Sequence, residues 1–517
     1  MRPRAGEFAS WIAASCLGFG AFHISPSRTL QSRAMPPLDL SPQVFRGLAA
    51  DVVQLAAEYL EGMDRLRNTP ELGGVDSERL FLSEVPEAGL GPQAFSALKD
   101  VIANSRVQNG RFFGYVLGSG EPIAAIADLL ASVLNQNVTA WRSGPAAVTI
   151  ERTVVKWLAE AIGCPGFYGN LTGGGSSANL MGLAMARESR LPSNATGLRR
   201  QSPAVVYASS EVHMSIPKAI ALLGIGRDNL MLVPADQNHR MDCAALECAI
   251  ENDITKGNTP IAVVSSAGTV KTGAVDPLVE ISRIARKYSM WLHVDGAYGA
   301  LAAIAAPEKL PGLALADSLS LDPHKWLYQP LDCGLLLYRD PGAAQIAFAY
   351  TGDYARVLSS DPVEGFAFFE ESMELSRRFR ALKLWLSLRY HGMRAFRASI
   401  RKDLELAQRL AKMIADDSRL ELLAPVELSA VCFRSEFRDF ERAGTESGQP
   451  GPAETSPSPR ARVSFERHDW GEIRLARLFD QPSHHACRHR CSTRRSTGGE
   501  SRSRWNQFGL CVGSQPP

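Results

Sequence analysis

The sequence predicts an α/β fold with a mostly parallel central sheet and helices on both faces. From about residue 120 to residue 435, short apolar segments alternate with stretches of helical spacing. Helices that connect parallel strands cover the faces of a sheet, so this alternation is typical of such a fold. The 517 residues, 45% hydrophobic and 21% charged, are enough for two or three domains.

The N-terminal part of the chain is expected to be helical. Residues 1–34 hold several arginines and a single acid, and we interpret them as a disordered extension, with a targeting peptide as the alternative. Apolar residues at helical spacing predict a helix over residues 41–62, whereas residues 70–91 are expected to be a loop. An N-terminal helical segment over residues 35–119 would thus precede a large domain over residues 120–390.

Six apolar segments of the large domain are expected to be strands. They are Val205–Ala208, Met231–Val233, Ile261–Ser265, Trp291–Val294, Ser318–Leu321 and Leu335–Tyr338. Helices are expected between them, one of them over Asp276–Tyr288 with Asp276 as its cap and Pro277 in its first turn. Ligands of such sheets lie at the carboxyl ends of the strands.

The C-terminal part is expected to begin with helices and then to lose regular structure. Helical spacing predicts long helices over Glu371–Leu388 and Leu404–Ile414. Residues 391–440 would begin a small C-terminal domain, with Leu428–Phe433 as its first strand. Residues 441–517 are rich in Gly, Ser, Pro and Arg, and we expect an atypical, disordered tail.

Composition excludes several classes of partner. The net charge of +2 favours neither nucleic acid nor a membrane surface, and no apolar run reaches the ~18–20 residues of a membrane span. Nine scattered cysteines indicate a reducing, cytoplasmic setting. We expect no metal, because one C-terminal group of histidines and cysteines lacks the spacing of a zinc site. That group is His484, His485, Cys487, His489 and Cys491.

Two polar residues that follow expected strands carry the clearest chemical signal. Lys325 lies just after the apolar segment Ser318–Leu321, and Asp295 ends the segment Trp291–Val294. A lysine amine condenses with an aldehyde, and a carboxylate pairs with a pyridinium nitrogen. Pyridoxal phosphate needs both groups. Read alone, Lys325 would be a surface lysine and Asp295 a strand-end cap.

Further candidates lie at other strand ends. Gly174, Gly175 and Ser176 precede a helix expected to begin near Ser176, where backbone N–H groups would bind a phosphate. This segment lacks the lysine of a nucleotide-binding P-loop, and no GxGxxG follows an early strand, which argues against a Rossmann dehydrogenase. His213 could stack on a ring, and Thr269 could touch a ring substituent. Read alone, they are a structural histidine and a turn threonine.

Together these segments resemble the group II pyridoxal-phosphate-dependent decarboxylases, and most closely their aromatic-L-amino-acid decarboxylase branch. The matching segments, in family order over roughly residues 40–435, are TGGGSSANL, SSEVHMS, SSAGT, WLHVDGAYGA, ADSLSLDPHKW and SRRFRALKLW. The resemblance implies a fold type I enzyme of the aspartate-aminotransferase kind that binds pyridoxal 5'-phosphate. It also implies a homodimer that releases CO2 and an amine from an amino acid.

The resemblance also implies the role of each candidate. Lys325 would bond to the cofactor aldehyde, and Asp295 would pair with the ring nitrogen. His213 and Ala297 would lie on opposite faces of the ring. The remaining cofactor-binding residues would be Gly174, Gly175, Ser176, Thr269, Asp322 and His324. Tyr354, counted on from Lys325, would protonate the substrate carbon from a mobile loop.

The chain departs from the family pattern at several places. Asn109–Phe113 replaces a His-Pro on the substrate side, Asn137 and Thr139 are polar positions of the aromatic pocket, and Asp322 replaces an asparagine of some members. The family's C-terminal domain is not recognisable after about residue 440. Two alternatives stay open, namely other pyridoxal phosphate chemistry (an aldehyde synthase or an aminotransferase) and a truncated, non-catalytic relative.

Overall fold

The computed structural model describes residues 38–118, 120–198, 202–350, 360–435 and 461–464. The chain divides into two compact units, which we describe separately. The first comprises Met1–Arg65 and Thr69–Ser105, and the second comprises Leu66–Asn68 and Arg106–Pro517. The boundary therefore lies near residue 105 and not at residue 119 as the sequence predicts. Among the described residues, no helix is both long and apolar enough to cross a membrane.

The first unit is helical, as predicted. Its elements are α2 (Pro42–Gly62), η1 (Met63–Arg65), α3 (Gly74–Phe81), η2 (Gly91–Ala97) and α4 (Leu98–Ala103). Helix α2 begins where Ser41 Oγ accepts a hydrogen bond from Val44 N at 3.3 Å, with a proline in the first turn. The expected loop over residues 70–91 is wrong in part, because α3 lies within it. None of these helices contains a buried residue.

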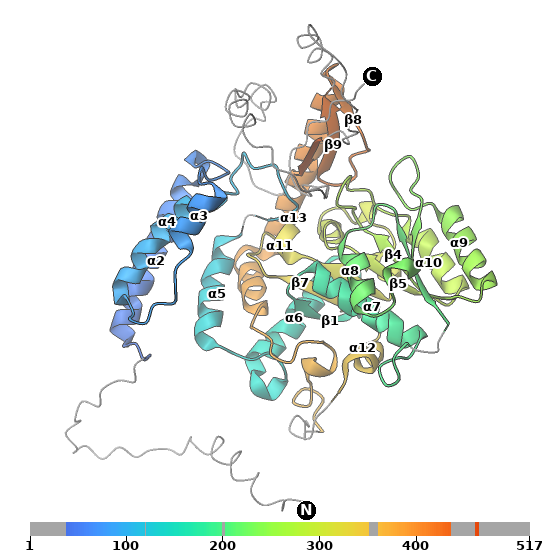
Figure 1. The fold of residues 1–517 in the computed structure, drawn as a ribbon, viewed down its shortest axis with the longest axis horizontal. Helices are drawn as coiled ribbons and strands as arrows, with labels where there is room; N and C mark the ends of the chain where they lie inside the picture. Colours follow the sequence, from blue (N-terminus) through green and yellow to red (C-terminus); the bar gives the residue numbers. More distant parts are fainter. Residues whose placement is uncertain (1–37, 119, 199–201, 351–359, 436–460, 465–517) are drawn as a thin grey trace, which may run out of the picture. The chain divides into compact units, whose positions relative to one another are not determined.

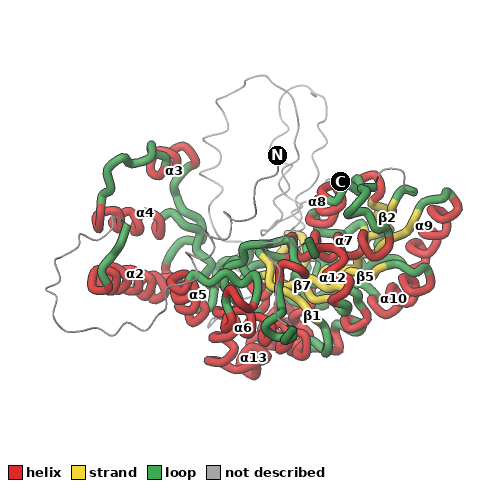
Figure 2. Tube along the Cα trace, turned by 90° about the horizontal axis from the view of Figure 1, so that it is seen from below, coloured by secondary structure: helices red, strands yellow, loops and turns green. Residues whose placement is uncertain are grey.

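The second unit is built on a seven-stranded sheet in the order β1-β7-β6-β5-β4-β2-β3 (Figures 1 and 2). The strands are β1 (Tyr168–Thr172), β2 (Ala204–Ser209), β3 (Leu230–Val233), β4 (Thr259–Ser266), β5 (Trp291–Asp295), β6 (Ser318–Leu321) and β7 (Gly334–Tyr338). All six predicted strands are present. Strands β3, β2, β4, β5 and β6 are parallel, whereas β7 is antiparallel to its neighbours β6 and β1. The mostly parallel sheet is therefore confirmed.

Helices cover both faces of this sheet (Figure 1). Successive residues of a strand point to opposite faces, so Leu335 and Leu337 join one apolar core while Leu336 joins the other. The first core packs against α6 (Pro145–Ala161), α9 (Cys243–Thr255), α10 (Leu278–Lys287) and α13 (Ala381–Ala415). The second packs against α7 (Gly175–Arg190), α8 (Ser215–Leu222) and α12 (Pro341–Phe348). The strands are buried on both faces, which explains their almost continuous apolar sequences.

The remaining elements are shorter connections and one further helix. They are α5 (Pro122–Leu134), η3 (Trp141–Ser143), η4 (Arg227–Asn229), η5 (Ala300–Ile304), η6 (Pro307–Lys309), η7 (Leu313–Leu315), α11 (Pro323–Trp326) and η9 (Phe368–Glu370). Helix α5 packs against α13.

The predicted cap of α10 is wrong. Its N-cap position is Pro277, and Asp276 makes no capping hydrogen bond. The Asp276 carboxylate instead accepts hydrogen bonds from Ser266 N and Met241 N, both at 2.7 Å. Burial raises the pKa of Asp276 to about 6, although these two bonds oppose the shift. Asp276 thus joins the end of β4 to the segment before α9.

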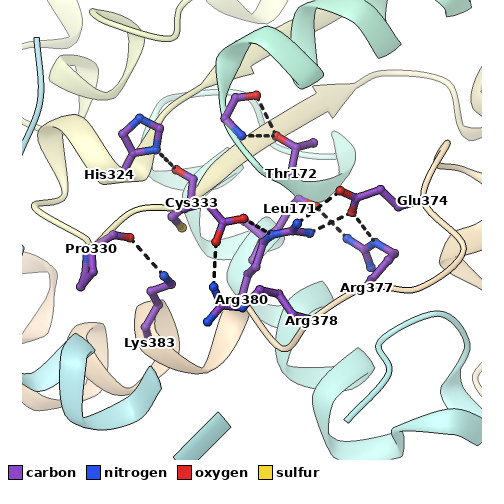
Figure 3. A network of polar contacts seen from close by, with 12 residues as sticks. Leu171, Thr172, His324, Pro330, Cys333, Glu374, Arg377, Arg378, Arg380 and Lys383 are labelled. Carbon is purple, nitrogen blue, oxygen red and sulfur yellow. Dashed lines mark hydrogen bonds and ion pairs between the residues drawn. The ribbon is translucent and has the colours of Figure 1, made fainter. Parts of the chain in front are cut away.

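The predicted helix over Glu371–Leu388 is wrong in its first half. Helix α13 begins only at Ala381 and runs to Ala415, with a kink at Gly392, where φ is 76°. The residues before Ala381 are held by long-range charged contacts, shown in Figure 3. Tertiary contacts have therefore overridden the local helical spacing.

Buried Arg377 is the centre of these contacts. Its guanidinium donates to Leu171 O at 2.8 Å and Val138 O at 2.9 Å, and it pairs with Glu151, which is also fully buried. Arg380 binds Glu374 at 2.8 Å and Asp332 at 2.9 Å, so Glu374 lies between Arg377 and Arg380 (Figure 3). The residues before Ala381 are thereby fixed to β1 through Leu171 and to the loop before β7 through Asp332.

The C-terminal part forms a small three-stranded antiparallel sheet. Its strands are β8 (Leu420–Leu422), β9 (Ala430–Ser435) and β10 (Ala461–Ser464), in the order β10-β9-β8. The predicted strand at Leu428–Phe433 is thus present as β9, but β8 precedes it. The expectation of an irregular tail from residue 441 is wrong at β10, because pairing with β9 gives residues 461–464 a strand that their sequence does not signal. Residues 1–37, 436–460 and 465–517, with the expected extension and the His–Cys group, lie outside the described residues.

We expect Arg377→Met to lower the midpoint of thermal unfolding strongly. Removing one member of a buried ion pair leaves the other charge without compensation, which costs about 3–5 kcal/mol. Arg378→Met is the matched control, because the side chain of Arg378 is 44% exposed and its ion pairs are worth about 0–1 kcal/mol. Calorimetry of the two variants checks this expectation, and equal midpoints would contradict it.

Candidate active site

The predicted site residues gather at one edge of the sheet. Strand β5 ends at Asp295, β6 leads to Lys325 in α11, and β1 leads through glycines to the start of α7. His213 follows β2, and Thr269 follows β4. These strands run in the same direction, so their carboxyl ends meet at a single edge.

Lys325 is largely buried, so the surface-lysine alternative is wrong. Its side chain is 15% exposed, and Nζ lies 3.0 Å from Asp322 Oδ2. The next residue, Trp326, is completely buried and fixes the short helix α11 against the core. Lys325 therefore projects from a rigid support into the site.

The Asp295 carboxylate is buried and accepts three hydrogen bonds. Oδ2 accepts from Asn179 Nδ2 at 2.9 Å, and Oδ1 accepts from Ser320 Oγ at 3.1 Å and Ala297 N at 3.2 Å. Donors from α7, β6 and its own loop thus hold the carboxylate in one orientation. A residue that only capped a strand would not need three hydrogen bonds to its carboxylate. The arrangement therefore favours a functional role for Asp295 over the strand-end cap.

His213 is held through one ring nitrogen. Nδ1 lies 2.8 Å from Ser215 Oγ and accepts a hydrogen bond from Ser215 N at 3.2 Å. Burial lowers the pKa of His213, the charge of Asp295 opposes this shift and the charge of Lys325 adds to it. The three residues therefore act on one another electrostatically within one site.

The glycine turn before α7 lies in close contact with neighbouring groups of the site. A Cβ on Gly175 would lie 2.7 Å from Ala297 Cβ and 3.0 Å from Asp322 Oδ2. Gly174 has a φ of 146°, and a Cβ on Gly334 of β7 would lie only 2.4 Å from its Cα. The close approach brings Ala297, Asp322 and the start of α7 together. The first N–H groups of α7, at Gly175 and Ser176, have no partner within the helix and are available to an anion.

Asp322 and His324 lie beside this turn. Asp322 Oδ1 is buried without a hydrogen-bond partner among the described residues. His324 Nδ1 lies 2.7 Å from Cys333 O, to which it must donate (Figure 3). Its Nε2 lies 3.6 Å from Asp322 Oδ2. Burial lowers the pKa of His324, and the charge of Asp322 opposes this. An orphaned oxygen beside a side-chain-free turn marks a place that is shaped for a polar ligand.

Thr269 fits the turn role better than a ring contact. Its hydroxyl lies 2.8 Å from Thr272 Oγ1 and accepts from Ala274 N at 3.2 Å, all within its own turn. A contact of Thr269 with a ring therefore stays a prediction. Tyr354 lies outside the described residues, and its role stays a prediction as well.

The polar departures in the expected substrate pocket have structural roles. Asn137 Oδ1 accepts from Arg377 N at 2.9 Å. Asn109 is buried, accepts from Asn68 Nδ2 at 2.7 Å and donates to Leu66 O at 3.0 Å. Both amides thus stabilise the backbone, so their polarity gives no information about the substrate.

Sequence reasoning missed the residues that support Asp295. Asn179, Ser320 and His293 are completely or almost completely buried around it. His293 could have been recognised, because residues two apart on a strand share a face of the sheet. Asn179 and Ser320 were hidden, since only the packing of α7 and β6 on β5 shows that they reach the carboxylate.

Comparison with known proteins places the chain among enzymes that bind pyridoxal phosphate. Residues 87–436 match the pyridoxal-dependent decarboxylase conserved domain. An aromatic-L-amino-acid decarboxylase of Bacillus atrophaeus is 35% identical over 77% of this chain and 83% of the relative. A phenylacetaldehyde synthase of Petunia hybrida is 32% identical over 78% and 82%. The crystal structure of Oryza sativa TDC with PLP and tryptamine matches with a TM-score of 0.72 and 27% identity, over 78% of this chain and 85% of that one.

We expect Gly182→Ala to lower the thermal unfolding midpoint. A Cβ at this position of α7 would lie 2.6 Å from the ring of buried His293, and overpacking of this kind costs about 1–3 kcal/mol. Gly47→Ala in α2 is the control, since no atom lies within 4 Å of its added Cβ. A Gly182→Ala midpoint equal to that of the unsubstituted chain would show that α7 does not pack this closely.

Proposed function

The chain belongs to the family of pyridoxal-dependent decarboxylases, and we propose that it converts an aromatic L-amino acid into CO2 and the corresponding amine. The observation that carries the proposal is the meeting of Lys325, Asp295 and a side-chain-free glycine turn at one edge of the sheet. Ala297 joins them, because its methyl group faces Gly175 and its N–H binds Asp295. Relatives named for aromatic amino acids support the substrate class.

The residues of this site fit pyridoxal phosphate. Gly174 and Gly175 place no side chain over the start of α7, where N–H groups would favour a phosphate. Asp322 is the exception, because its carboxylate Oδ1 faces the same region and would repel a phosphate. Lys325 supplies the amine for the aldehyde, and buried Asp295 supplies a fixed negative charge for the ring nitrogen. When bound, pyridoxal phosphate would supply an electron-accepting ring for the electron pair that stays on the substrate carbon when CO2 leaves.

Each residue of the chain then has a distinct task. Asp295 holds a proton on the ring nitrogen, and its three hydrogen bonds keep the carboxylate in place while it does so. Lys325 would hold the cofactor through its aldehyde, and Asp322, whose Oδ2 lies 3.0 Å from Nζ, would orient this amine. His213 and Ala297 confine the two faces of the ring. The helices and strands that carry these side chains hold them in place before the reaction begins. This fixed orientation lowers the activation barrier of the reaction.

The main alternative is an aldehyde synthase on the same cofactor. This second function is favoured by relatives named phenylacetaldehyde synthase and 4-hydroxyphenylacetaldehyde synthase, which are 32% and 34% identical to this chain. The two reactions begin with the same loss of CO2, so the cofactor residues do not separate them. The identity of the products does.

We further propose that the enzyme is a cytoplasmic homodimer. Helix α5 exposes a row of apolar side chains: Ile126, Leu129, Leu130, Val133 and Leu134. Exposed apolar patches of this kind are typical of interfaces, and a second copy would cover them. Among the described residues, the cysteines Cys164, Cys243, Cys248 and Cys333 are free thiols, which suits a reducing compartment.

We expect Lys325→Ala to remove the visible absorbance that appears when the purified protein is mixed with pyridoxal phosphate. The band requires a covalent bond between the lysine amine and the aldehyde. Lys156→Ala, whose side chain is 74% exposed on α6, is the control and should keep the band. A band that survives Lys325→Ala would refute the assignment of this lysine.

We expect the unsubstituted enzyme to release amine and CO2 in equal amounts from an aromatic amino acid, without consuming oxygen. Mass analysis of the products, together with an oxygen electrode, measures both. An aldehyde product with oxygen uptake would establish the alternative function. A screen of the other amino acids under the same conditions tests the substrate class.

A further inference from the structure

A chain of buried hydrogen bonds runs behind Asp295. Trp291 Nε1 lies 2.8 Å from Ser318 Oγ, which lies 2.8 Å from His293 Nδ1. On the other side of the imidazole, His293 Nε2 lies 2.9 Å from Asn179 Oδ1. Asn179 Nδ2 then reaches both Asp295 Oδ2 and Ser215 Oγ at 2.9 Å. The chain joins β5, β6, α7 and α8 through side chains that are all buried.

The carboxylate of Asp295 fixes the direction of every bond. A carboxylate only accepts, so the amide nitrogen of Asn179 must face Asp295 and its Oδ1 must face His293. His293 Nε2 therefore donates to Asn179 Oδ1, and in a neutral imidazole Nδ1 is then the acceptor. Ser318 Oγ donates to this Nδ1 and accepts from the indole N–H of Trp291, which only donates. All bonds of the chain are thus satisfied with one orientation of the amide.

The same amide reaches His213 through Ser215. Asn179 uses its second N–H to donate to Ser215 Oγ, whose own hydrogen is then directed at His213 Nδ1 at 2.8 Å. Because Ser215 N donates to the same Nδ1, this nitrogen acts as an acceptor. A neutral His213 therefore carries its proton on Nε2. One amide group thus connects the carboxylate and the imidazole of the site.

We infer that Asn179 is a positioning residue, and that His293 locks its amide so that one N–H orients Asp295 and the other, through Ser215 Oγ, directs a hydroxyl donor at His213 Nδ1. The inference rests on the proposed function, which places Asp295 and His213 against the cofactor ring. A reversed amide would turn Oδ1 toward the carboxylate and lose both donations. The N–H of His293 prevents this reversal because it needs the oxygen on its own side.

The surroundings keep His293 in the required state. His293 is completely buried, and burial lowers its pKa to about 4, against the opposing charge of Asp295. The charges that act on the pKa of neighbouring His213 are those of Asp295, Lys325, Asp322 and Lys218. Gly182 of α7 leaves the space that the imidazole occupies. His293 therefore stays neutral and keeps its Nε2 proton at physiological pH.

The test compares cofactor affinity among variants that keep or lose these bonds. Asn179→Leu removes both donations. His293→Gln keeps a donor at the position of Nε2, whereas His293→Asn places its amide too far from Asn179. Apoprotein is titrated with pyridoxal phosphate, the dissociation constant is read from absorbance, and circular dichroism in the visible region reports the setting of the bound ring. Thermal unfolding of each apoprotein measures stability separately.

We expect Asn179→Leu to weaken cofactor binding about 10- to 100-fold, since hydrogen bonds to charged groups carry free energies of that size. His293→Asn should also weaken binding and alter the dichroism, while His293→Gln should stay close to the unsubstituted protein. Tyr207→Phe is the control, because it removes a buried hydrogen bond to Asp253 at 2.9 Å elsewhere in the sheet. It should lower the unfolding midpoint and leave cofactor affinity unchanged.

Three results would overturn the inference. One is an unchanged dissociation constant and dichroism for Asn179→Leu. Another is equal loss in His293→Gln and His293→Asn, which also decides the matter if Asn179→Leu does not fold. The third is equal loss in Tyr207→Phe, which would indicate a general effect of stability. In each case, binding by the unsubstituted protein leaves the proposed function intact, whereas absence of that binding would remove both proposals.

Discussion

The structure depends on one buried carboxylate, that of Asp295 at the end of β5. Removing a carboxylate from water is costly unless donors replace the lost hydration. Three donors do so here, from Asn179 on α7, Ser320 on β6 and the N–H of Ala297. Because these donors come from α7, β6 and the loop after β5, the three elements must meet at this edge of the sheet. The proposed chemistry requires the same carboxylate as a fixed partner for a ring nitrogen.

Glycines allow the elements to approach closely enough. Gly182 lets α7 lie against the ring of His293, and Gly175 lets the start of α7 approach Ala297 and Asp322. Gly334 brings β7 against the turn before α7. A side chain at any of these positions would collide with backbone or with buried groups. These close approaches allow α7 to pack on the sheet and place Asn179 against the carboxylate.

The sequence predicted the elements whose structure depends on their own residues, namely the buried strands and the site residues that follow them. Buried parallel strands have continuous apolar sequences, and Lys325 and Asp295 follow two of them directly, so both strands and site residues were recognisable. The segment before Ala381 has helical spacing, but long-range ion pairs of Arg377 and Arg380 prevent a helix there. Strand β10 forms only through pairing with β9. Asn179 carries no local signal, because its role depends on groups brought to it from two other elements, β5 and α8.

The central claim is that Lys325 and Asp295 hold opposite ends of one ring. A crystal structure of the protein with bound pyridoxal phosphate tests it most directly. The account predicts a covalent link from Lys325 Nζ to the cofactor, and a ring nitrogen ~2.7–2.9 Å from an Asp295 carboxylate oxygen. A ring bound away from Asp295, or a cofactor attached to another lysine, would contradict it.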